Sequence, residues 1–299
     1  MRFAQHIAPT TMKNPLVSII IPTYNRPQLL PRAVKSALTQ TVDDLEVIVV
    51  DDASTEPVNL PEHQRLRIIR LPKNQGIAAV RNIGAKNAQG RWLTYLDDDD
   101  QLLPQMVEVS LKAVAETKLP KPVAILSGLE VINQEGKVIE RRIPPTLPCG
   151  KHFFLEEIDS KQSFLSKQTL VVEREVLLGI GGYDEKLASR EHTEMFLRLN
   201  PVCSLLGLPT ITYQQFRHEG PRLSKTQSLR QVDFHHLVGK HKSLFLAHPK
   251  MFANFVYEHA LKSYELGQLG SAFSNFLWAL QLDPRHVLGR VTWSYRKGL

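Results

Sequence analysis

The stretch GRWLTYLDDDD, residues 90–100, joins an apolar run of strand length to four consecutive aspartates. Two earlier runs have the same form, because residues 17–22 (VSIIIP) and residues 45–50 (LEVIVV) are rich in β-branched side chains and are followed by polar residues. Between these runs, residues 27–40 and 77–88 carry apolar side chains at helical spacing. Strands that alternate with helices in this way predict a parallel sheet covered on both faces.

Polar residues follow three of the predicted strands, in the loops of residues 22–25, 51–54 and 97–100. The carboxyl ends of neighbouring parallel strands lie at one edge of the sheet, where ligands bind in open α/β folds. These loops therefore predict a ligand site at that edge.

Four adjacent aspartates, residues 97–100, indicate a metal site there. Such carboxylates repel one another unless a cation lies among them, and Mg²⁺ or Mn²⁺ prefers oxygen ligands. A solvated acidic turn is the alternative, but the position directly after a strand favours metal binding. Asp51 and Asp52 follow the second strand, where a carboxylate can accept hydrogen bonds from a ribose or a nucleobase. Arg81, on the next helix, suits either a diphosphate or a structural ion pair.

Composition restricts the class of protein. The 299 residues are 42% hydrophobic and 22% charged, as in ordinary globular proteins, and no apolar run approaches the roughly 20 residues that span a bilayer. Residues 1–14 do not resemble a signal peptide. Cys149 and Cys203 lack the spacing of a metal site and are too few for a disulfide framework. We therefore expect a cytoplasmic protein.

The net charge of +7 is spread along the chain without a basic run. This distribution favours an ordinary positive surface over a nucleic-acid groove, so we expect no nucleic-acid partner. Peripheral contact with the anionic inner face of a membrane is a second use of the charge.

The pattern changes twice further along the chain. Residues 120–167 are weakly patterned. Within them, residues 123–127 and 129–132 have the pattern of strands, whereas residues 141–151 carry three prolines and a glycine, which favours a loop over the site or a segment that faces an acceptor. Residues 227–299 are almost wholly helical in pattern, and a helix pair at 257–267 and 271–282 resembles one tetratricopeptide unit. One unit cannot form a solenoid, so we expect a helical cap or a partner-docking element. The predicted domains are residues 1–225 and 226–299.

Five motifs carry a resemblance to the inverting family 2 glycosyltransferases with the GT-A fold. The resemblance extends over about residues 15–225. It implies a Rossmann-like α/β fold with a mostly parallel sheet flanked by helices. The all-helical C-terminal extension follows this fold. The motifs are VSIIIPTYNR (17–26), EVIVVDDAS (46–54), NQGIAAVRNIG (74–84), GRWLTYLDDDD (90–100) and GGYDEKLASREHTEMFLRL (181–199).

The resemblance implies roles for individual residues. Asp97 and Asp99 correspond to the acidic pair of the DxD motif and would hold Mn²⁺ or Mg²⁺, with Asp99 the more direct ligand. Asp98 would contact the ribose or the sugar. His218, in the late loop of residues 216–224, would approach the metal or the phosphate, and an exposed loop histidine is the alternative. The nucleotide would be surrounded by Pro22, Thr23, Tyr24, Asn25, Asp51, Asp52 and Arg81.

One position departs from the family pattern. The family usually has Glu-Asp where this chain has Glu191 and His192, and that aspartate is commonly the general base. An imidazole with a pKa of about 6.5 can also accept a proton from an acceptor hydroxyl at neutral pH. Glu191 would then orient His192 or act as the base itself. The alternative is a surface histidine in a chain that has lost its base.

The resemblance predicts sugar transfer from a nucleotide-sugar, a UDP-sugar by analogy, to the hydroxyl of a glycan or glycolipid acceptor. The setting it implies is synthesis of a bacterial surface polysaccharide or lipopolysaccharide. A degenerate GT-A fold that binds nucleotide-sugar or acceptor as a scaffold is the first alternative. A nucleotidyltransferase is the second, but it would carry a Gly-rich, Lys-bearing loop where this chain has PTYNR, residues 22–26.

Overall fold

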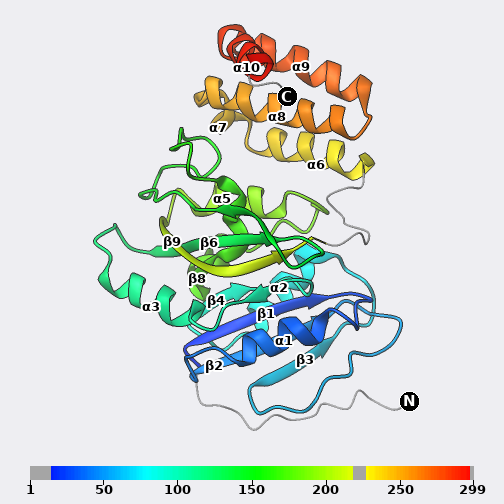
Figure 1. Ribbon diagram of the computed structural model, residues 1–299, viewed down its shortest axis with the longest axis vertical. Helices are drawn as coiled ribbons and strands as arrows, with labels where there is room; N and C mark the ends of the chain where they lie inside the picture. The colour runs from blue at the N-terminus through cyan, green and yellow to red at the C-terminus, as the bar shows by residue number, and fades with distance from the viewer. Residues whose placement is uncertain (1–14, 218–226, 297–299) are drawn as a thin grey trace.

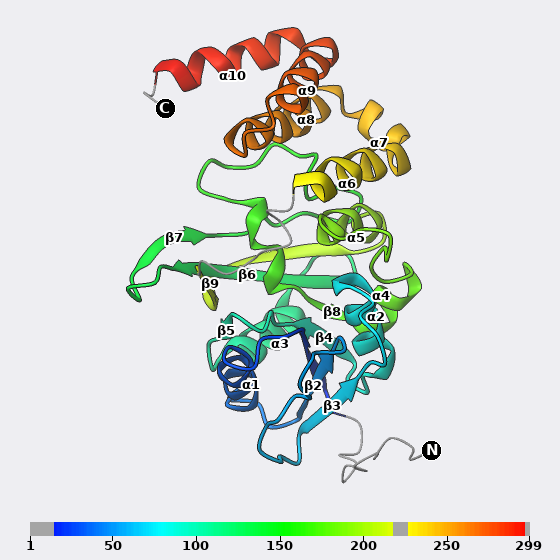
Figure 2. The same ribbon diagram turned by 90° about the vertical axis from the view of Figure 1, so that its right-hand side faces the viewer.

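The computed structural model describes residues 15–217 and 227–296. Its described strands form one sheet in the order β3-β2-β1-β4-β8-β6-β9-β5, with β7 paired to β6. Helices flank this sheet, and a stack of further helices lies beyond α5 (Figures 1 and 2). The strands are β1 Val17–Thr23, β2 Leu45–Asp51, β3 Leu66–Arg70, β4 Trp92–Tyr95, β5 Gln101–Leu102, β6 Val123–Ile132, β7 Val138–Arg142, β8 Val171–Glu173 and β9 Ser204–Phe216.

The first half of the sheet is parallel, as predicted, and β1 pairs with β2 on one side and with β4 on the other. Alternate side chains of β1 enter different cores because successive residues of a strand face opposite sides. Ile20 packs in the core that α2 covers, whereas Ile19 and Ile21 pack in the core that α1 covers. The helices of this domain are α1 Leu30–Leu38, α2 Ile77–Asn87, α3 Met106–Glu116, η1 Phe164–Thr169, α4 Arg174–Gly179 and α5 Glu191–Leu199.

The second half of the sheet is mixed, which corrects the expectation of a mostly parallel sheet. Strand β8 runs antiparallel to both β4 and β6, β5 runs antiparallel to β9, and β9 runs parallel to β6. Two strands that follow each other in the sequence can pair in parallel only if a crossover, usually a helix, connects them. The alternation of strands and helices that supplies such crossovers ends before the weakly patterned residues 120–167.

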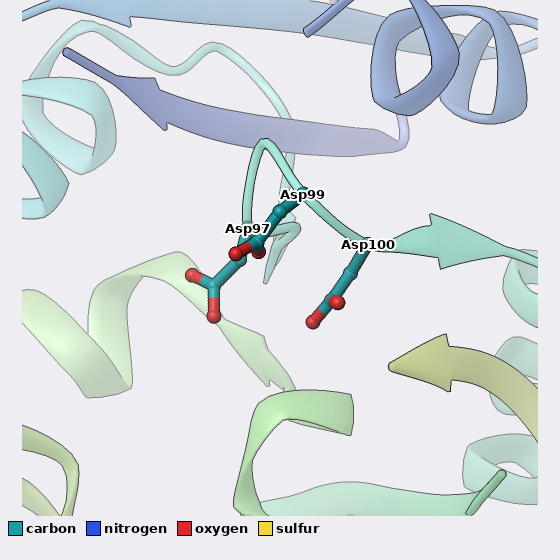
Figure 3. A group of neighbouring side chains, drawn as sticks. All are labelled: Asp97, Asp99 and Asp100. Carbon is teal, nitrogen blue, oxygen red and sulfur yellow. The ribbon is translucent and has the colours of Figure 1, made fainter. Parts of the chain in front are cut away.

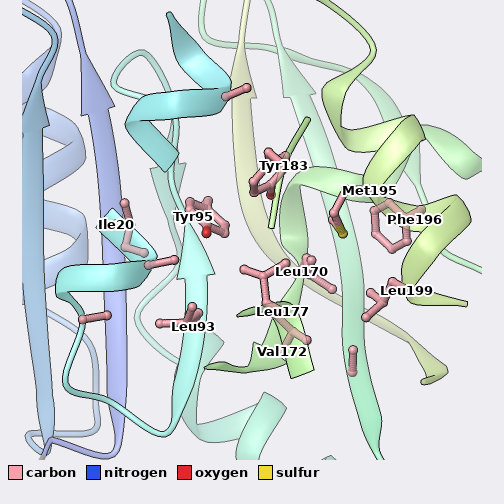
Figure 4. Packing of buried hydrophobic residues seen from close by; sticks show 14 of the residues in the cluster. Ile20, Leu93, Tyr95, Leu170, Val172, Leu177, Tyr183, Met195, Phe196 and Leu199 are labelled. Atoms are coloured by element: carbon pink, nitrogen blue, oxygen red, sulfur yellow. The ribbon is translucent and has the colours of Figure 1, made fainter. Parts of the chain in front are cut away.

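Close packing brings α2 to the sheet. A Cβ atom on Gly84 would lie 2.4 Å from Cγ2 of Ile20 on β1, so glycine is required for this approach. The approach matters for the site because Arg81 lies on the same helix. The core continues from Ile20 and Leu93 through Tyr95 and Tyr183 to the side chains of α5 (Figure 4).

Gly84→Ala is expected to lower the free energy of unfolding by about 1–3 kcal/mol, because the added methyl group would overpack α2 against β1. Chemical denaturation at equilibrium measures the change. Gly239→Ala is the control, since a Cβ atom at that helical position would meet nothing within 4 Å. Equal stability of the two variants would contradict the requirement for glycine at position 84.

The C-terminal helices include the predicted pair, although its first helix begins earlier than expected. Helices α8 and α9 are joined by a turn at Gly267, which has a φ of +74°. The predicted boundary at residues 225–226 lies outside the described residues and stays a prediction. None of the described helices is long and apolar enough to cross a membrane. The helices are α6 Gln227–Lys240, α7 Lys242–Ala247, α8 Pro249–Glu265, α9 Leu269–Leu282 and α10 Pro284–Arg296.

These helices share a core with the α/β domain. Leu197 of α5 and Leu155 of the segment between β7 and η1 belong to the same buried cluster as Phe234 of α6 and Phe252 of α8. In both views α6 lies directly against the side of α5 that faces away from the sheet (Figures 1 and 2). The helical extension is therefore packed on the α/β domain through α5.

A buried carboxylate joins the two parts. Glu194 on α5 is fully buried, and its Oε1 accepts hydrogen bonds from His241 at 3.0 Å and Lys240 at 2.9 Å. Burial opposes ionisation of Glu194, but the bonds from His241, Arg198 and Lys240 hold its pKa below the ordinary value. The carboxylate therefore contributes stability above its unfolded-state pKa of about 4.3, and this contribution is lost as the pH falls through the lowered folded-state value.

Glu194→Gln is expected to cost about 1–3 kcal/mol at pH 7, because it removes the charge that accepts hydrogen bonds from the partly exposed Arg198 and Lys240. The difference from the parent protein should shrink as the pH falls below about 4, where the unfolded parent protein binds the proton that its folded state does not. Denaturation at pH 7 and at acidic pH measures both values. Glu265→Gln removes an exposed ion pair with Lys262 and is the control. A difference that grows on acidification would contradict this account.

Candidate functional site

Three aspartates cluster on the loop between β4 and β5. Asp97, Asp99 and Asp100 each offer a carboxylate oxygen, and these oxygens all lie within 4.8 Å of one another. Their side chains point to the same side of the loop (Figure 3). Asp97 and Asp99 are the predicted pair. Asp100 was not predicted as a metal ligand. It belongs to the run of four aspartates, but it lies outside the DxD pair.

Donor groups surround the cluster. Arg81 contacts Asp97 at 2.8 Å, and Arg26 contacts Asp99 at 3.0 Å. Asp100 accepts hydrogen bonds from the hydroxyl of Tyr213 at 2.8 Å and from the backbone N–H of Phe216 at 3.0 Å. Sequence reasoning missed Arg26, although it ends the first motif.

The three aspartates fit a hard divalent cation, because all three side chains are carboxylates and share one loop. Burial raises the pKa of Asp100 well above its ordinary value, and the charges of Asp97 and Asp99 raise it further. This repulsion is the condition that a bound cation relieves. Asp97, Asp99 and Asp100 are thus the described residues suited to hold Mn²⁺ or Mg²⁺.

Asp98 faces the protein instead. It is buried, and its carboxylate accepts hydrogen bonds from Thr23 Oγ1 at 2.7 Å and from Arg26 at 2.9 Å. Burial raises the pKa of Asp98 to about 6, against the lowering effect of Arg26 and Thr23. Asp98 therefore joins the aspartate loop to the end of β1, and its predicted contact with the ribose or the sugar stays a prediction.

Strand β2 ends beside β1, where Thr23 is paired with Asp51. Asp52 accepts hydrogen bonds from the backbone N–H groups of Gln75 at 2.7 Å and Gly76 at 2.9 Å, so it fixes the turn before α2. Asp51 is fully buried, and its Oδ1 accepts a bond from the Ser54 N–H at 2.9 Å.

The remaining members of the predicted nucleotide set differ in exposure. Tyr24 and Asn25 are exposed, whereas Pro22 is buried within β1. Asn25 has a φ of 53° and accepts a hydrogen bond from the Thr55 N–H at 2.7 Å, which ties the two loops together. The structure thus brings these residues to the predicted edge of the sheet, and their contacts with a nucleotide stay predictions.

Arg81 connects the two halves of the site. Its Nη2 lies 2.8 Å from Asp97 and its Nη1 lies 2.7 Å from Glu191 Oε1 on α5. Only 4% of its side chain is exposed, and both carboxylates raise its pKa despite the opposing effect of burial. A permanent cation therefore lies between Asp97 of the aspartate cluster and Glu191, and the predicted contact of Arg81 with a nucleotide stays a prediction.

His192 lies next to Glu191 at the start of α5. It is buried, its Nδ1 is 3.0 Å from Glu191 Oε1, and its ring packs against Tyr183 with centroids 5.3 Å apart. Burial and the nearby Arg81 lower the pKa of His192, so the imidazole is neutral at neutral pH. His192 is therefore not a surface residue.

The tautomer follows from Glu191. Burial opposes its ionisation, but His192, Arg81 and Lys167 together hold the pKa of Glu191 below its usual range. An ionised carboxylate only accepts hydrogen bonds, so Nδ1 of His192 carries the proton and Nε2 keeps the lone pair. This is the form that a general base requires. Lys167, on η1, is a further cation beside Glu191 that sequence reasoning missed.

His218 lies outside the described residues, as does most of the predicted closing loop of residues 216–224. Its predicted approach to metal or phosphate stays a prediction. The described part of that loop ends at Arg217, which lies 3.7 Å from Glu140 on β7.

Comparison with known proteins identifies the domain. Residues 18–162 match the protein family described as "Glycosyl transferase family 2". The chain carries a family 2 glycosyltransferase domain. The match includes β1, β2, α2 and the aspartate cluster, whereas Glu191 and His192 lie beyond its end.

Two curated relatives extend the likeness of this glycosyltransferase domain. An uncharacterized glycosyltransferase of Haemophilus influenzae is 30% identical over 191 residues, which cover 62% of this chain and 62% of that relative. The chondroitin synthase of Pasteurella multocida is 31% identical over 210 residues, which cover 68% of this chain and 21% of the synthase. The chain thus spans less than two thirds of the length of these relatives.

A solved structure shares the fold. The crystal structure of S. aureus TarS 1–349 in complex with UDP-GlcNAc has a TM-score of 0.62 and 18% sequence identity, covering 91% of this chain and 82% of that chain. At this identity the likeness concerns the fold. Together with the family match, it confirms the predicted GT-A class and the helical C-terminal region.

Proposed function

We propose that this protein is a metal-dependent, inverting glycosyltransferase that moves a sugar from a nucleotide-sugar, most simply a UDP-sugar, to an acceptor hydroxyl. The observation that carries the proposal is Arg81, which contacts Asp97 of the aspartate cluster and Glu191 beside His192. Through these two ion pairs, the buried Arg81 connects the candidate cation site to the carboxylate that holds the neutral imidazole. The complex of TarS with UDP-GlcNAc supports the choice of donor.

The donor half has the charges that a diphosphate leaving group requires. Asp97, Asp99 and Asp100 would hold Mn²⁺ or Mg²⁺, which as a Lewis acid stabilises negative charge on the departing diphosphate. Arg26, within 3.0 Å of Asp99, adds a second positive charge at the same edge of the sheet. Thr23, Asn25, Asp51 and Asp52 line the predicted nucleotide side.

The acceptor half supplies the base. His192 takes the acceptor hydroxyl proton at Nε2, and the acceptor oxygen forms its bond to the anomeric carbon of the donor sugar. The bond from that carbon to the diphosphate breaks, and the nucleoside diphosphate leaves with the electron pair. One displacement from the face opposite the leaving group inverts the anomeric configuration. Glu191 stabilises the protonated imidazole and fixes its orientation.

The relatives and the charge support a proposal for the wider setting. Chondroitin synthase is named for polysaccharide synthesis, and we place this enzyme in bacterial surface polysaccharide or lipopolysaccharide synthesis with a glycan or glycolipid acceptor. A cytoplasmic enzyme with a net charge of +7 would be attracted to the anionic inner face of the membrane.

A second candidate function has one observation in its favour. Glu191 is already engaged by Arg81 at 2.7 Å, and the usual aspartate is replaced by His192. A fold that binds the nucleotide-sugar or acceptor as a scaffold without transfer would tolerate both features.

A donor screen separates the candidates. The purified protein is incubated with UDP-, GDP- and dTDP-sugars and a panel of glycan acceptors, with and without Mn²⁺ or Mg²⁺, and released nucleotide is measured. Metal-dependent release that increases with an acceptor supports the enzyme. Binding of a donor without release by any acceptor supports the scaffold, and no binding of any donor contradicts both.

A further inference from the structure

The segment that leads into α5 is held by the helical extension. Ser189 donates hydrogen bonds from its backbone N–H at 2.7 Å and from its hydroxyl at 2.8 Å to one oxygen of Asp233 on α6. Both residues are buried. The chain therefore reaches the start of α5 along the surface of α6.

Arg190 follows in an unusual backbone conformation. Its φ of 63° and ψ of 10° are left-handed, a region that a residue with a long side chain seldom adopts without outside support. The support comes from its side chain, because the guanidinium lies 5.0 Å from the ring centroid of Phe234 and 5.6 Å from that of Phe255. Nη2 of Arg190 also lies 2.8 Å from Nδ1 of His259 on α8.

His259 is arranged to accept that bond. It is buried and stacks on Phe234 with ring centroids 3.8 Å apart, and its Nε2 lies 3.0 Å from Oε1 of Gln231. Burial and the neighbouring Arg190 lower the pKa of His259 to about 3, so its ring is neutral. A proton on Nε2 satisfies the Gln231 oxygen and leaves Nδ1 to accept from Arg190.

Further contacts hold the same helix on the same side. Glu194 is bonded to His241 and Lys240 one turn after Glu191, and Leu197 packs in the core of the helical extension. The helix that presents Glu191 and His192 to Arg81 is therefore fixed at its start, its first turn and its second turn by residues of the extension.

We propose that the helical extension positions α5 for the transfer step, with Arg190 as a positioning residue. The pocket of Phe234, Phe255 and His259 holds Arg190 in its left-handed conformation and so sets the first turn of α5, from which Glu191 and His192 act. The proposal rests on the proposed function. It assigns the extension a role in the transfer step in addition to capping the fold or docking a partner.

Two amide substitutions at one position test the contact. His259→Asn places its side-chain oxygen near the position of Nδ1 and can still accept from Arg190, whereas the longer side chain of His259→Gln reaches toward the position of Nε2. Both variants replace a buried ring by an amide, so each is the matched control for the other in folding.

Hydrogen exchange of the peptide over residues 186–199 and transfer kinetics are measured for both. His259→Gln is expected to lose protection in the first turn of α5 and to lower kcat by about 10- to 100-fold, as a misplaced base does. The donor KM should stay within about twofold, because the donor side lies on β1 and the aspartate loop. His259→Asn should remain close to the parent protein in both measurements.

A double-mutant cycle of His259 and His192 distinguishes a positioning role from a general effect on stability. If His259 acts through His192, His259→Gln should have little further effect on kcat in a His192→Ala background. An equal loss in both backgrounds, or unchanged exchange in His259→Gln, would overturn the proposal. Absence of transfer by the parent protein with every donor is a failure of the proposed function instead, and the exchange measurement then still decides whether Arg190 positions α5.

Discussion

Replacement of His192 by alanine is expected to lower kcat for sugar transfer by about 10²- to 10⁴-fold, the contribution typical of a positioned general base. The imidazole is neutral because burial and Arg81 lower its pKa, and it is oriented by Glu191 at 3.0 Å. Alanine removes the lone pair at Nε2 without removing any group from the aspartate cluster. The dissociation constant of the donor nucleotide should therefore stay close to that of the parent protein.

The pH dependence of kcat gives an independent test. His192 acts in its neutral form, and its folded-state pKa lies below 6.5, so the acid-side fall in activity should have its midpoint below pH 6.5. His192→Asp introduces the residue that the resemblance to family 2 implies at this position and should retain more activity than His192→Ala. Its acid-side midpoint should move further down, because an aspartate has an ordinary pKa of about 3.9.

His63→Ala, at an exposed histidine far along the chain from α5, is the control for the loss of one imidazole. If His192→Ala keeps most of the parent activity while Glu191→Gln loses it, Glu191 is the base and His192 only supports it. If neither substitution changes kcat, the base lies elsewhere and the assignment of this pair is wrong.

Local patterns predicted the first half of the fold well. The strands at 17–22 and 45–50 and the helix at 77–88 appear as β1, β2 and α2 with small shifts at their ends. These elements are recognisable because each one's apolar side chains follow the period of its own backbone. The aspartate cluster was predictable for a related reason, since consecutive residues on one loop must lie close together.

Contacts between distant segments could not be read in the same way. Periodicity shows which side of an element faces the core, but it does not show which element lies opposite. The pairing of β9 with β6 and the contact of Arg26 with Asp99 therefore had no sequence signal. Arg81 was selected for its charge and its motif, yet its contact with Glu191 joins segments 110 residues apart. Arg190 was not selected at all, because its importance lies in the pocket of α6 and α8.

Asp99→Ala is expected to lower kcat/KM by about 10³-fold, similar to the loss of one group that stabilises charge in a transition state. Asp99 contributes one of three carboxylates that lie within 4.8 Å of one another, so its removal should weaken Mn²⁺ binding as well. Calorimetric titration with Mn²⁺ in the presence of UDP, together with transfer kinetics, measures both effects. Asp159→Ala, at an exposed loop aspartate, is the control.

Removal of the metal should reproduce the loss in the parent protein. Chelation is expected to abolish transfer, and addition of Mn²⁺ or Mg²⁺ should restore it in the parent protein and in Asp159→Ala but not in Asp99→Ala. Arg81 and Arg26 remain in place when the metal is removed, so any residual activity measures what these two cations contribute alone. Full activity after chelation would show that they suffice for the departing diphosphate, and the aspartate cluster would then serve to hold the arginines rather than a metal.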